Sequence, residues 1–341
     1  MTKQMKEISN CMIELDKGKI DEKILSSGEY KSEDGNIFIK KWLIKNENDE
    51  PIQNDENKYI SIIKKDGFQY AGSLNNKFQR EGYGLETFTN GDKYFGQYDS
   101  DFRTENGIYY FAPTKNSENI LTECYLGQWN SNLKNRNGIY IWMDQPENNF
   151  EYEKANFDAY IGEFEEEKYL RGTYINKLNN QFYLYHGSFS EDGKKNDNNA
   201  YFFSSKGNKI FHGQIKNDTL KSGFMGALDT EGEKVTEIVY CKFNEDGSVS
   251  DVIEEKKLNV DDVEEEKKNM VNFRSIIFDS DYFMKIYNKF TKIKIKIDNL
   301  EDITEIMERE DNIPEIEKIL NKYTKKNIYF DIEENFFGRE M

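Results

Sequence analysis

The sequence predicts a mainly β protein in which β-hairpins stack one after another. A motif of the form Tyr-x-Gly-x-aromatic recurs along the middle of the 341-residue chain, and its copies start 24, 31, 35, 25 and 26 residues apart. A second glycine followed by alternating bulky residues comes after most copies, and turn dipeptides such as Asn90-Gly91 separate the segments. A period of this size is typical of repeat arrays, which form surfaces more often than reaction centres. The leading aromatic residues are Tyr70, Tyr94, Tyr125, Tyr160, Tyr185 and Phe211.

Within each copy the glycine lies between aromatic rings. Residues two apart on a strand share a face, so Tyr94, Gly96 and Tyr98 point the same way. A Cβ atom at the glycine would collide with a ring from the neighbouring strand. We therefore expect Gly127→Val to destabilise the array. The residues assigned to this structural role are Tyr70, Gly72, Tyr94, Gly96, Tyr125, Gly127, Tyr160, Gly162, Tyr185, Gly187 and Gly213.

The remaining segments are assigned in chain order. Residues 1–27 have a modest apolar side and could form a helix, and residues 28–69 are expected to be a strand-rich cap. Residues 70–226 hold the six repeats, which we call the array. Residues 227–257 contain a degenerate capping repeat, with a strand expected from Val235 to Phe243, and a linker.

Residues 258–341 differ from the array because they lack glycine until Gly338. A helix is expected to start near Val260, where acidic residues favour the positive end of the helix dipole. Met270 and Phe273 follow at helical spacing, whereas the isoleucines from Ile293 alternate with lysines as in a strand. The segment is predicted to be a smaller helical or α+β unit that docks onto the array or onto another protein.

The repeats resemble the MORN repeat family. The copy from Tyr70 to Lys93 is the most similar, with both glycines of the family's Gly-x-Gly at Gly82 and Gly84 and a closing turn at Asn90-Gly91. The resemblance covers residues 70–226 and implies an elongated, twisted antiparallel sheet with one hairpin per repeat. It also implies that rings line one groove, and it implies no activity.

The rings of this groove are the candidate protein-binding residues. A single sheet has at most one covered face, so some of these rings are expected to stay accessible and to contact a partner. In the alternative, the N-terminal region or the C-terminal segment covers them. The candidate residues are Tyr98, Trp129, Tyr140, Trp142 and Phe164.

Charge restricts the class of partner. The formal net charge is −17 and the calculated pI is about 4.8. Nucleic acid and anionic lipid surfaces would be repelled, whereas basic proteins would be attracted. The charge could also serve only to keep an aromatic repeat protein in solution.

No catalytic, cofactor-binding or metal-binding residue is predicted, and we expect no enzyme. The two histidines, His186 and His212, occupy the same slot of successive repeats, roughly 10 Å apart, which is too far for one metal ion. Nucleophile-elbow, phosphate-loop and kinase motifs are absent from the sequence. Three scattered cysteines and an N-terminus without an apolar run indicate a cytoplasmic protein.

The functional hypothesis is a non-catalytic scaffold or assembly subunit that binds other proteins through the groove and the C-terminal unit. The resemblance to repeat-bearing scaffolds such as radial spoke head components implies a cilium (axoneme) or another cytoskeletal complex. A homodimer is left open. The alternatives are a peripheral membrane adaptor or tether, and an accessory subunit of a large organellar complex.

Overall fold

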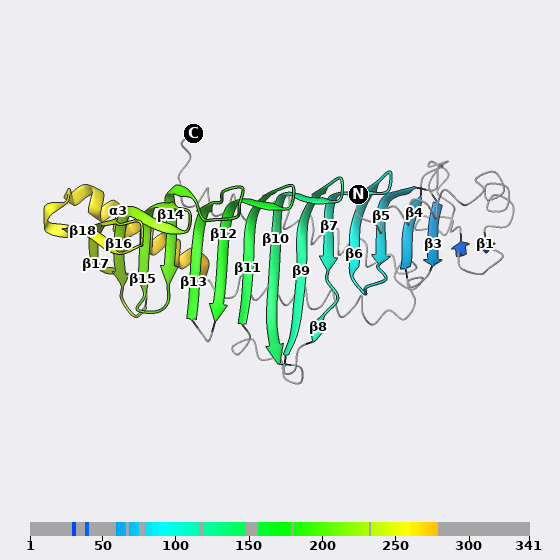
Figure 1. Cartoon of the computed structure of the whole chain (residues 1–341), viewed down its shortest axis with the longest axis horizontal. Helices are drawn as coiled ribbons and strands as arrows, with labels where there is room; N and C mark the ends of the chain where they lie inside the picture. The colour runs from blue at the N-terminus through cyan, green and yellow to red at the C-terminus, as the bar shows by residue number, and fades with distance from the viewer. Residues whose placement is uncertain are drawn as a thin grey trace, which may run out of the picture. The chain divides into compact units, whose positions relative to one another are not determined.

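The structure is a computed structural model that describes residues 29–31, 38–40, 59–65, 68–74, 79–115, 119–146, 156–178, 181–231 and 233–278. The described residues form two compact units. The first runs up to Ala112 and includes Trp129–Leu133, and the second comprises Pro113–Gln128 and the chain from residue 134 onward. Strands dominate both units (Figure 1), which confirms the predicted mainly β fold of stacked antiparallel hairpins. The helix considered for residues 1–27 and all predictions beyond residue 278 lie outside the described residues.

Neighbouring strands follow chain order in each unit. In the first unit β1 pairs with β2, and β3 to β7 pair successively; in the second, β8 pairs with β9 and β9 to β18 succeed one another. The first unit contains β1 (Glu29–Lys31), β2 (Phe38–Lys40), β3 (Tyr59–Lys65), β4 (Phe68–Leu74), β5 (Arg80–Thr87), β6 (Lys93–Asp99) and β7 (Phe102–Tyr110). The second contains β8 (Thr114–Lys115), most of β9 (Asn119–Asn130) and β10 (Leu133–Pro146), β11 (Asn156–Glu165), β12 (Lys168–Leu178), β13 (Gln181–Ser188), β14 (Asp197–Ser204), β15 (Lys209–Lys216), β16 (Thr219–Leu228), β17 (Val235–Phe243), β18 (Val249–Glu254), the short 3₁₀ helix η1 (Glu255–Lys257) and α3 (Val260–Phe278).

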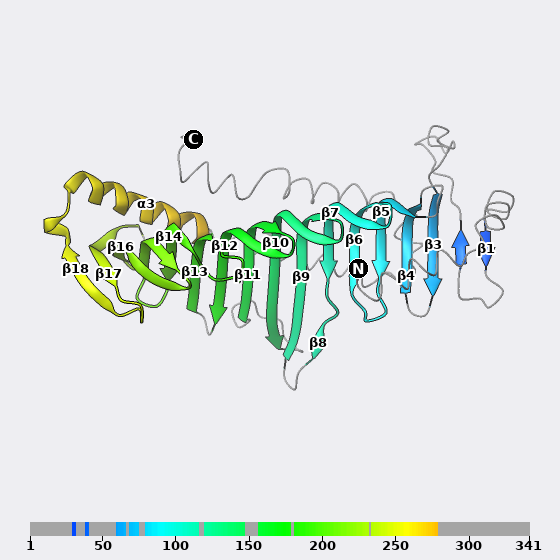
Figure 2. The ribbon, with the colours of Figure 1, turned by 45° about the horizontal axis from the view of Figure 1, so that its top comes forward.

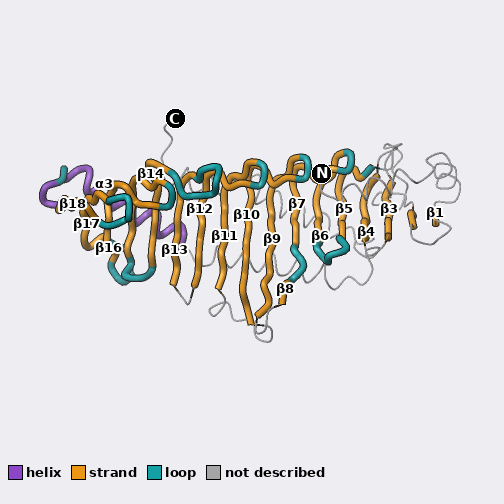
Figure 3. The backbone as a smooth tube through the Cα atoms, in the orientation of Figure 1, coloured by secondary structure: helices purple, strands orange, loops and turns teal. Residues whose placement is uncertain are grey.

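Glycines face glycines across neighbouring strands, which keeps the repeats in register. The turns after β11, β13 and β15 lie at the same end of the strands in the second unit (Figure 3). In the fifth copy the fully buried Ala200 takes the place of the second glycine, opposite Gly213. The glycine pairs are Gly72–Gly84, Gly84–Gly96 and Gly96–Gly107 in the first unit, and Gly138–Gly162, Gly162–Gly172, Gly172–Gly187 and Gly213–Gly223 in the second.

Most hairpins contain a bulge in their second strand, and its size depends on the number of residues between the two glycines of the repeat. In the β6–β7 hairpin, two residues of β7, Glu105 and Asn106, have no Cα partner on β6. In the β15–β16 hairpin, only one residue of β16, Lys221, has no Cα partner on β15. The longer bulge contains a left-handed residue: φ is 49° at Glu105, and at the same repeat position it is 70° at Gly82 and 53° at Arg136. Larger residues have therefore replaced the glycine of the first repeat while the backbone conformation has stayed the same.

Helix α3 covers part of the sheet in the second unit (Figure 2). Asn259 caps its first turn, because its side-chain oxygen accepts a hydrogen bond from the backbone N–H of Asp261 at 2.9 Å. Met270 and Phe273 are buried against β14 to β16, on the face opposite the paired glycines. The described part of the predicted 258–341 unit thus packs on the array, and the helix starts at Val260 as predicted.

The left-handed bulge residues yield a stability prediction. An L-residue in this conformation costs roughly 1 kcal/mol that glycine avoids. Glu105→Gly should therefore raise the free energy of unfolding, measured by urea denaturation. The gain should be smaller than about 1 kcal/mol, because glycine loses more conformational entropy on folding than glutamate does.

The matched control is Leu170→Gly. Leu170 lies in the one-residue bulge of the β11–β12 hairpin, where the backbone is not left-handed, so the same change should lower stability. Equal effects of the two substitutions would contradict the assignment of strain to Glu105.

Candidate functional site

The leading tyrosine of each repeat packs against the paired glycines. A Cβ atom built on Gly107 would lie 2.6 Å from Cζ of Tyr94, and one built on Gly127 would lie 2.6 Å from Cζ of Tyr125. These distances are too short for any side chain. The expected ring from the neighbouring strand is present at Gly107, whereas at Gly127 the ring belongs to the same strand, two residues earlier, and the neighbouring strand contributes the backbone of Gly138. The tyrosine hydroxyl then donates a hydrogen bond to the backbone carbonyl three residues later. Its partners are Gln97 for Tyr94 (3.1 Å), Gln128 for Tyr125 (2.8 Å), Glu163 for Tyr160 (2.7 Å) and Ser188 for Tyr185 (2.6 Å).

A cation lies over most of these tyrosine rings. The guanidinium of Arg103 is 5.5 Å from the ring centre of Tyr94 and 4.5 Å from that of Trp129. In the second unit the ammonium of Lys134 is 5.7 Å from the ring centre of Tyr125. Cations at these distances are attracted by the ring quadrupole. Arg80 over Tyr70 and Lys195 over Tyr185 repeat the arrangement, and in the fourth copy Tyr169 stacks on Tyr160 instead, at 4.0 Å between ring centres.

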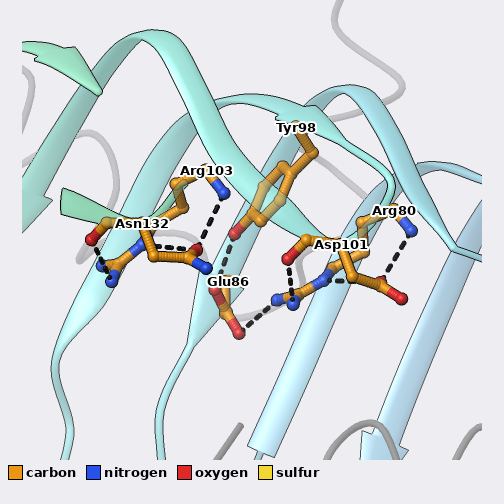
Figure 4. Close-up of polar contacts among 6 residues, drawn as sticks. All are labelled: Arg80, Glu86, Tyr98, Asp101, Arg103 and Asn132. Carbon is orange, nitrogen blue, oxygen red and sulfur yellow. Dashed lines mark hydrogen bonds and ion pairs between the residues drawn. The ribbon is translucent and has the colours of Figure 1, made fainter. Parts of the chain in front are cut away.

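The next turn along the chain fixes the position of each cation. The two turn residues have positive φ, as in type I′ hairpins, and the second of them bonds back to the preceding hairpin. Asp101 donates its N–H to the carbonyl of Arg80 (3.1 Å) and accepts the N–H of Arg80 (2.9 Å), and Asn132 does the same for Arg103 (Figure 4). We call this reciprocal pair the turn clasp. Glu167 with Lys134 and Asp218 with Lys195 form it in the second unit.

The first clasp extends into a buried ion pair. Arg80 donates to Glu86 at 2.6 Å, and the Tyr98 hydroxyl donates to the other Glu86 oxygen at 2.6 Å (Figure 4). Burial, and after it the Glu86 carboxylate, raise the pKa of Tyr98 well above its usual range. Each of these buried polar groups has a partner, so the network locks the first repeats together.

Four of the five candidate groove rings are buried, so they form the core of their units and cannot serve as an open groove. Three of them pack edge-on against a leading tyrosine, with ring centres 5.3 Å apart for Tyr98 and Tyr94, 5.4 Å for Trp129 and Tyr94, and 5.0 Å for Phe164 and Tyr160. Tyr140 packs on Tyr125 in a tilted arrangement at 6.2 Å. Only Trp142 is half-buried. The exposed fractions are 2% for Tyr98, 5% for Trp129, 7% for Tyr140 and 2% for Phe164.

Two further rings on return strands were not among the candidates, although they occupy the same repeat position as Tyr140. Tyr109 in the first unit and Tyr174 in the second are half-buried. Their hydroxyls donate to acids two residues before a leading tyrosine, Asp92 at 2.8 Å and Asp158 at 2.9 Å. The recurring acid at this position is the sequence signal that could have revealed them. In the second unit the half-buried ring of Tyr174 thus lies beside a carboxylate that is itself partly exposed.

The two histidines lie on the opposite face of the second unit, and Tyr201 stands between them in the strand register. His212 bonds Glu266 of α3 at 2.8 Å and Asn199 at 2.7 Å. His186 is buried and lies 2.9 Å from the Thr173 hydroxyl. Both histidines thus help to hold this face of the sheet together and to hold α3 on it.

Models of known protein families and curated protein sequences give no match to this chain. Within the described ranges, no helix is long and apolar enough to cross a membrane. The same part of the chain has no group of three or more His, Cys, Asp or Glu side chains arranged to hold a metal ion.

Burial of His186 leads to a prediction about pH. Burial, followed by the charge of Arg171, lowers the pKa of His186 from 6.5 to about 4. The unfolded chain therefore binds a proton between these values that the folded chain does not, so stability falls as the pH falls through this window. At about pH 5 the loss should be about 2 kcal/mol relative to neutral pH.

Urea denaturation of the wild type and of His186→Asn at the two pH values isolates this effect, because carboxylates contribute equally to both chains. The stability difference between the two proteins should shrink by that amount at the lower pH. A difference that stays constant with pH would show that His186 is not held neutral.

Proposed function

We propose that this protein is a non-catalytic scaffold subunit whose array binds a basic protein partner. The observation that carries the proposal is the combination of half-buried rings on the return strands with carboxylates on the strands beside them, such as Tyr174 of β12 with Asp158 of β11. Aromatic side chains dominate protein interfaces, and acids beside them favour cationic groups. The net charge of −17 would speed the encounter with a basic partner.

We further propose that the array is of the MORN type. The support is the Tyr-x-Gly-x-aromatic motif together with one hairpin per repeat and glycines in register. On the strength of that resemblance, the partner complex is proposed to belong to a cilium or to another part of the cytoskeleton, within the cytoplasm.

The proposal is tested by purifying the tagged full-length chain from the cells that make it. It should elute with a basic protein in fixed stoichiometry on size-exclusion chromatography with light scattering, and salt should dissociate the pair because exposed charges are screened. Elution of the chain as a homodimer alone would argue against the hetero-assembly.

Flotation with vesicles that contain anionic lipid separates the scaffold from the membrane alternative. The chain should remain in the vesicle-free fraction, because its net charge opposes binding to an anionic surface. Co-flotation at physiological salt would replace the scaffold with a membrane tether.

A further inference from the structure

The half-buried Trp142 lies among acidic residues on one face of the second unit. Asp144 follows it at the next position of β10 on that face, and Asp158 is its Cα partner on β11. Asp144 and Asp158 are therefore diagonal neighbours on the two strands. Such neighbours lie about 7–8 Å apart, so one long side chain can reach both carboxylates. On β12, Tyr174 and Asn176 continue the same face. We call Trp142, Asp144, Asp158, Tyr174 and Asn176 the acidic ring patch.

Among the described residues, no cation forms an ion pair with the carboxylates of the patch, and the one cation near its rings is Lys195, whose ammonium lies 5.7 Å from the ring centre of Tyr174. Asp158 accepts hydrogen bonds from the Tyr174 hydroxyl (2.9 Å) and the Asn176 amide (2.6 Å), both of which are neutral donors. The buried Oδ1 of Asp144 has no hydrogen-bond partner. Across the described part of the chain, no ion pair is formed by either carboxylate. A carboxylate charge that is partly removed from water strongly favours a positive group nearby.

The same unit shows how rings and an acid of this kind hold a cation. Lys134 lies 4.9 Å from the ring centre of Tyr140, and its ammonium bonds Glu167 of the next turn. Trp142 packs on Tyr140 at 4.2 Å between ring centres, on the same strand. An internal lysine thus lies over Tyr140, whereas beside Trp142 the described part of the chain places acids and no cation.

We propose that the acidic ring patch binds a lysine or arginine side chain of a basic protein segment. This proposal rests on the proposed function and names its contact point. The indole is the ring that attracts cations most strongly, and Asp144 and Asp158 supply the compensating charge. A peptide rather than a metal ion is the occupant, because Trp142 offers no metal ligand and the Tyr174 hydroxyl is already bonded to Asp158.

The first unit supplies an internal contrast. Asp92 occupies the repeat position of Asp158, but it is buried, and its two oxygens accept the Tyr109 hydroxyl (2.8 Å) and the backbone N–H of Ala112 (2.7 Å). Its charge is therefore used within the unit, so we assign the cation site to the patch around Trp142 and not to every repeat.

The test uses the full chain labelled with 5-fluorotryptophan, which gives one fluorine resonance for each of its three tryptophans. Trp142→Phe assigns the resonance of the patch. The probe is a blocked peptide of alternating glycine and lysine, with the glycine–glutamate peptide as the reference. The lysine peptide should shift the Trp142 resonance, and the glutamate peptide should not.

Asp158→Asn and Asp144→Asn each remove one charge and keep the side-chain shape, and each should weaken peptide binding roughly fivefold. Glu165→Gln is the matched control, since it removes the same charge from an exposed position at the end of β11 and should leave the affinity unchanged. Thermal melting confirms that each variant is folded. If Asp158→Asn does not fold, the affinity of Asp144→Asn tests the site.

Equal weakening by Glu165→Gln, or an unchanged affinity in both patch variants, would overturn the site. Failure of the patch is distinguishable from failure of the scaffold. If the native partner still co-purifies with the patch variants, the scaffold stands and the site is wrong; if the peptide binds but no partner co-purifies, the reverse holds.

Discussion

The contact between a tyrosine ring and a pair of glycines is the constraint on which the rest of the structure depends. The ring needs the space that a Cβ would take on either strand, as Gly107 shows for Tyr94. Once the ring is in place, its hydroxyl satisfies a backbone carbonyl within the same repeat. A bulky aromatic residue is thereby buried without an unsatisfied polar atom, and the register of two strands is fixed at one point.

From this contact the repeat extends outward in two directions. On the turn side, Arg103 lies over the ring and is fixed by Asn132 of the following turn, so each hairpin positions the next. On the other side, the return-strand rings Tyr109 and Tyr174 bond acids and remain half-buried. The inner rings are therefore buried in the core of their units, whereas the outer rings are partly exposed.

Much of this could be predicted from the sequence because the glycine and ring positions carry the signal directly. The paired glycines, the strand from Val235 to Phe243 and the helix start at Val260 all follow from local pattern. The exposure of each ring does not, because it depends on neighbouring repeats: Trp129 is buried by Tyr94, which precedes it by a whole repeat.

Some features were visible in the sequence but were not interpreted. Arg80, Arg103 and Lys134 each precede the second glycine of their repeat by four residues, which marks the position of the cation over the ring. Where the two glycines of the repeat are only ten residues apart, the uncharged Tyr169 and Leu220 take this place, three residues before the second glycine. The spacing of the two glycines thus correlates with both the bulge and the covering residue.

A double-mutant cycle between Tyr94 and Gly107 tests the central claim most directly. In the wild type, Gly107→Ala should cost about 1–3 kcal/mol in the free energy of unfolding, because the added methyl group collides with the ring. In a Tyr94→Val background the ring is absent, so the same substitution should cost much less. Strictly additive effects of the two substitutions would show that Gly107 is required for a reason other than the ring, and would contradict the account.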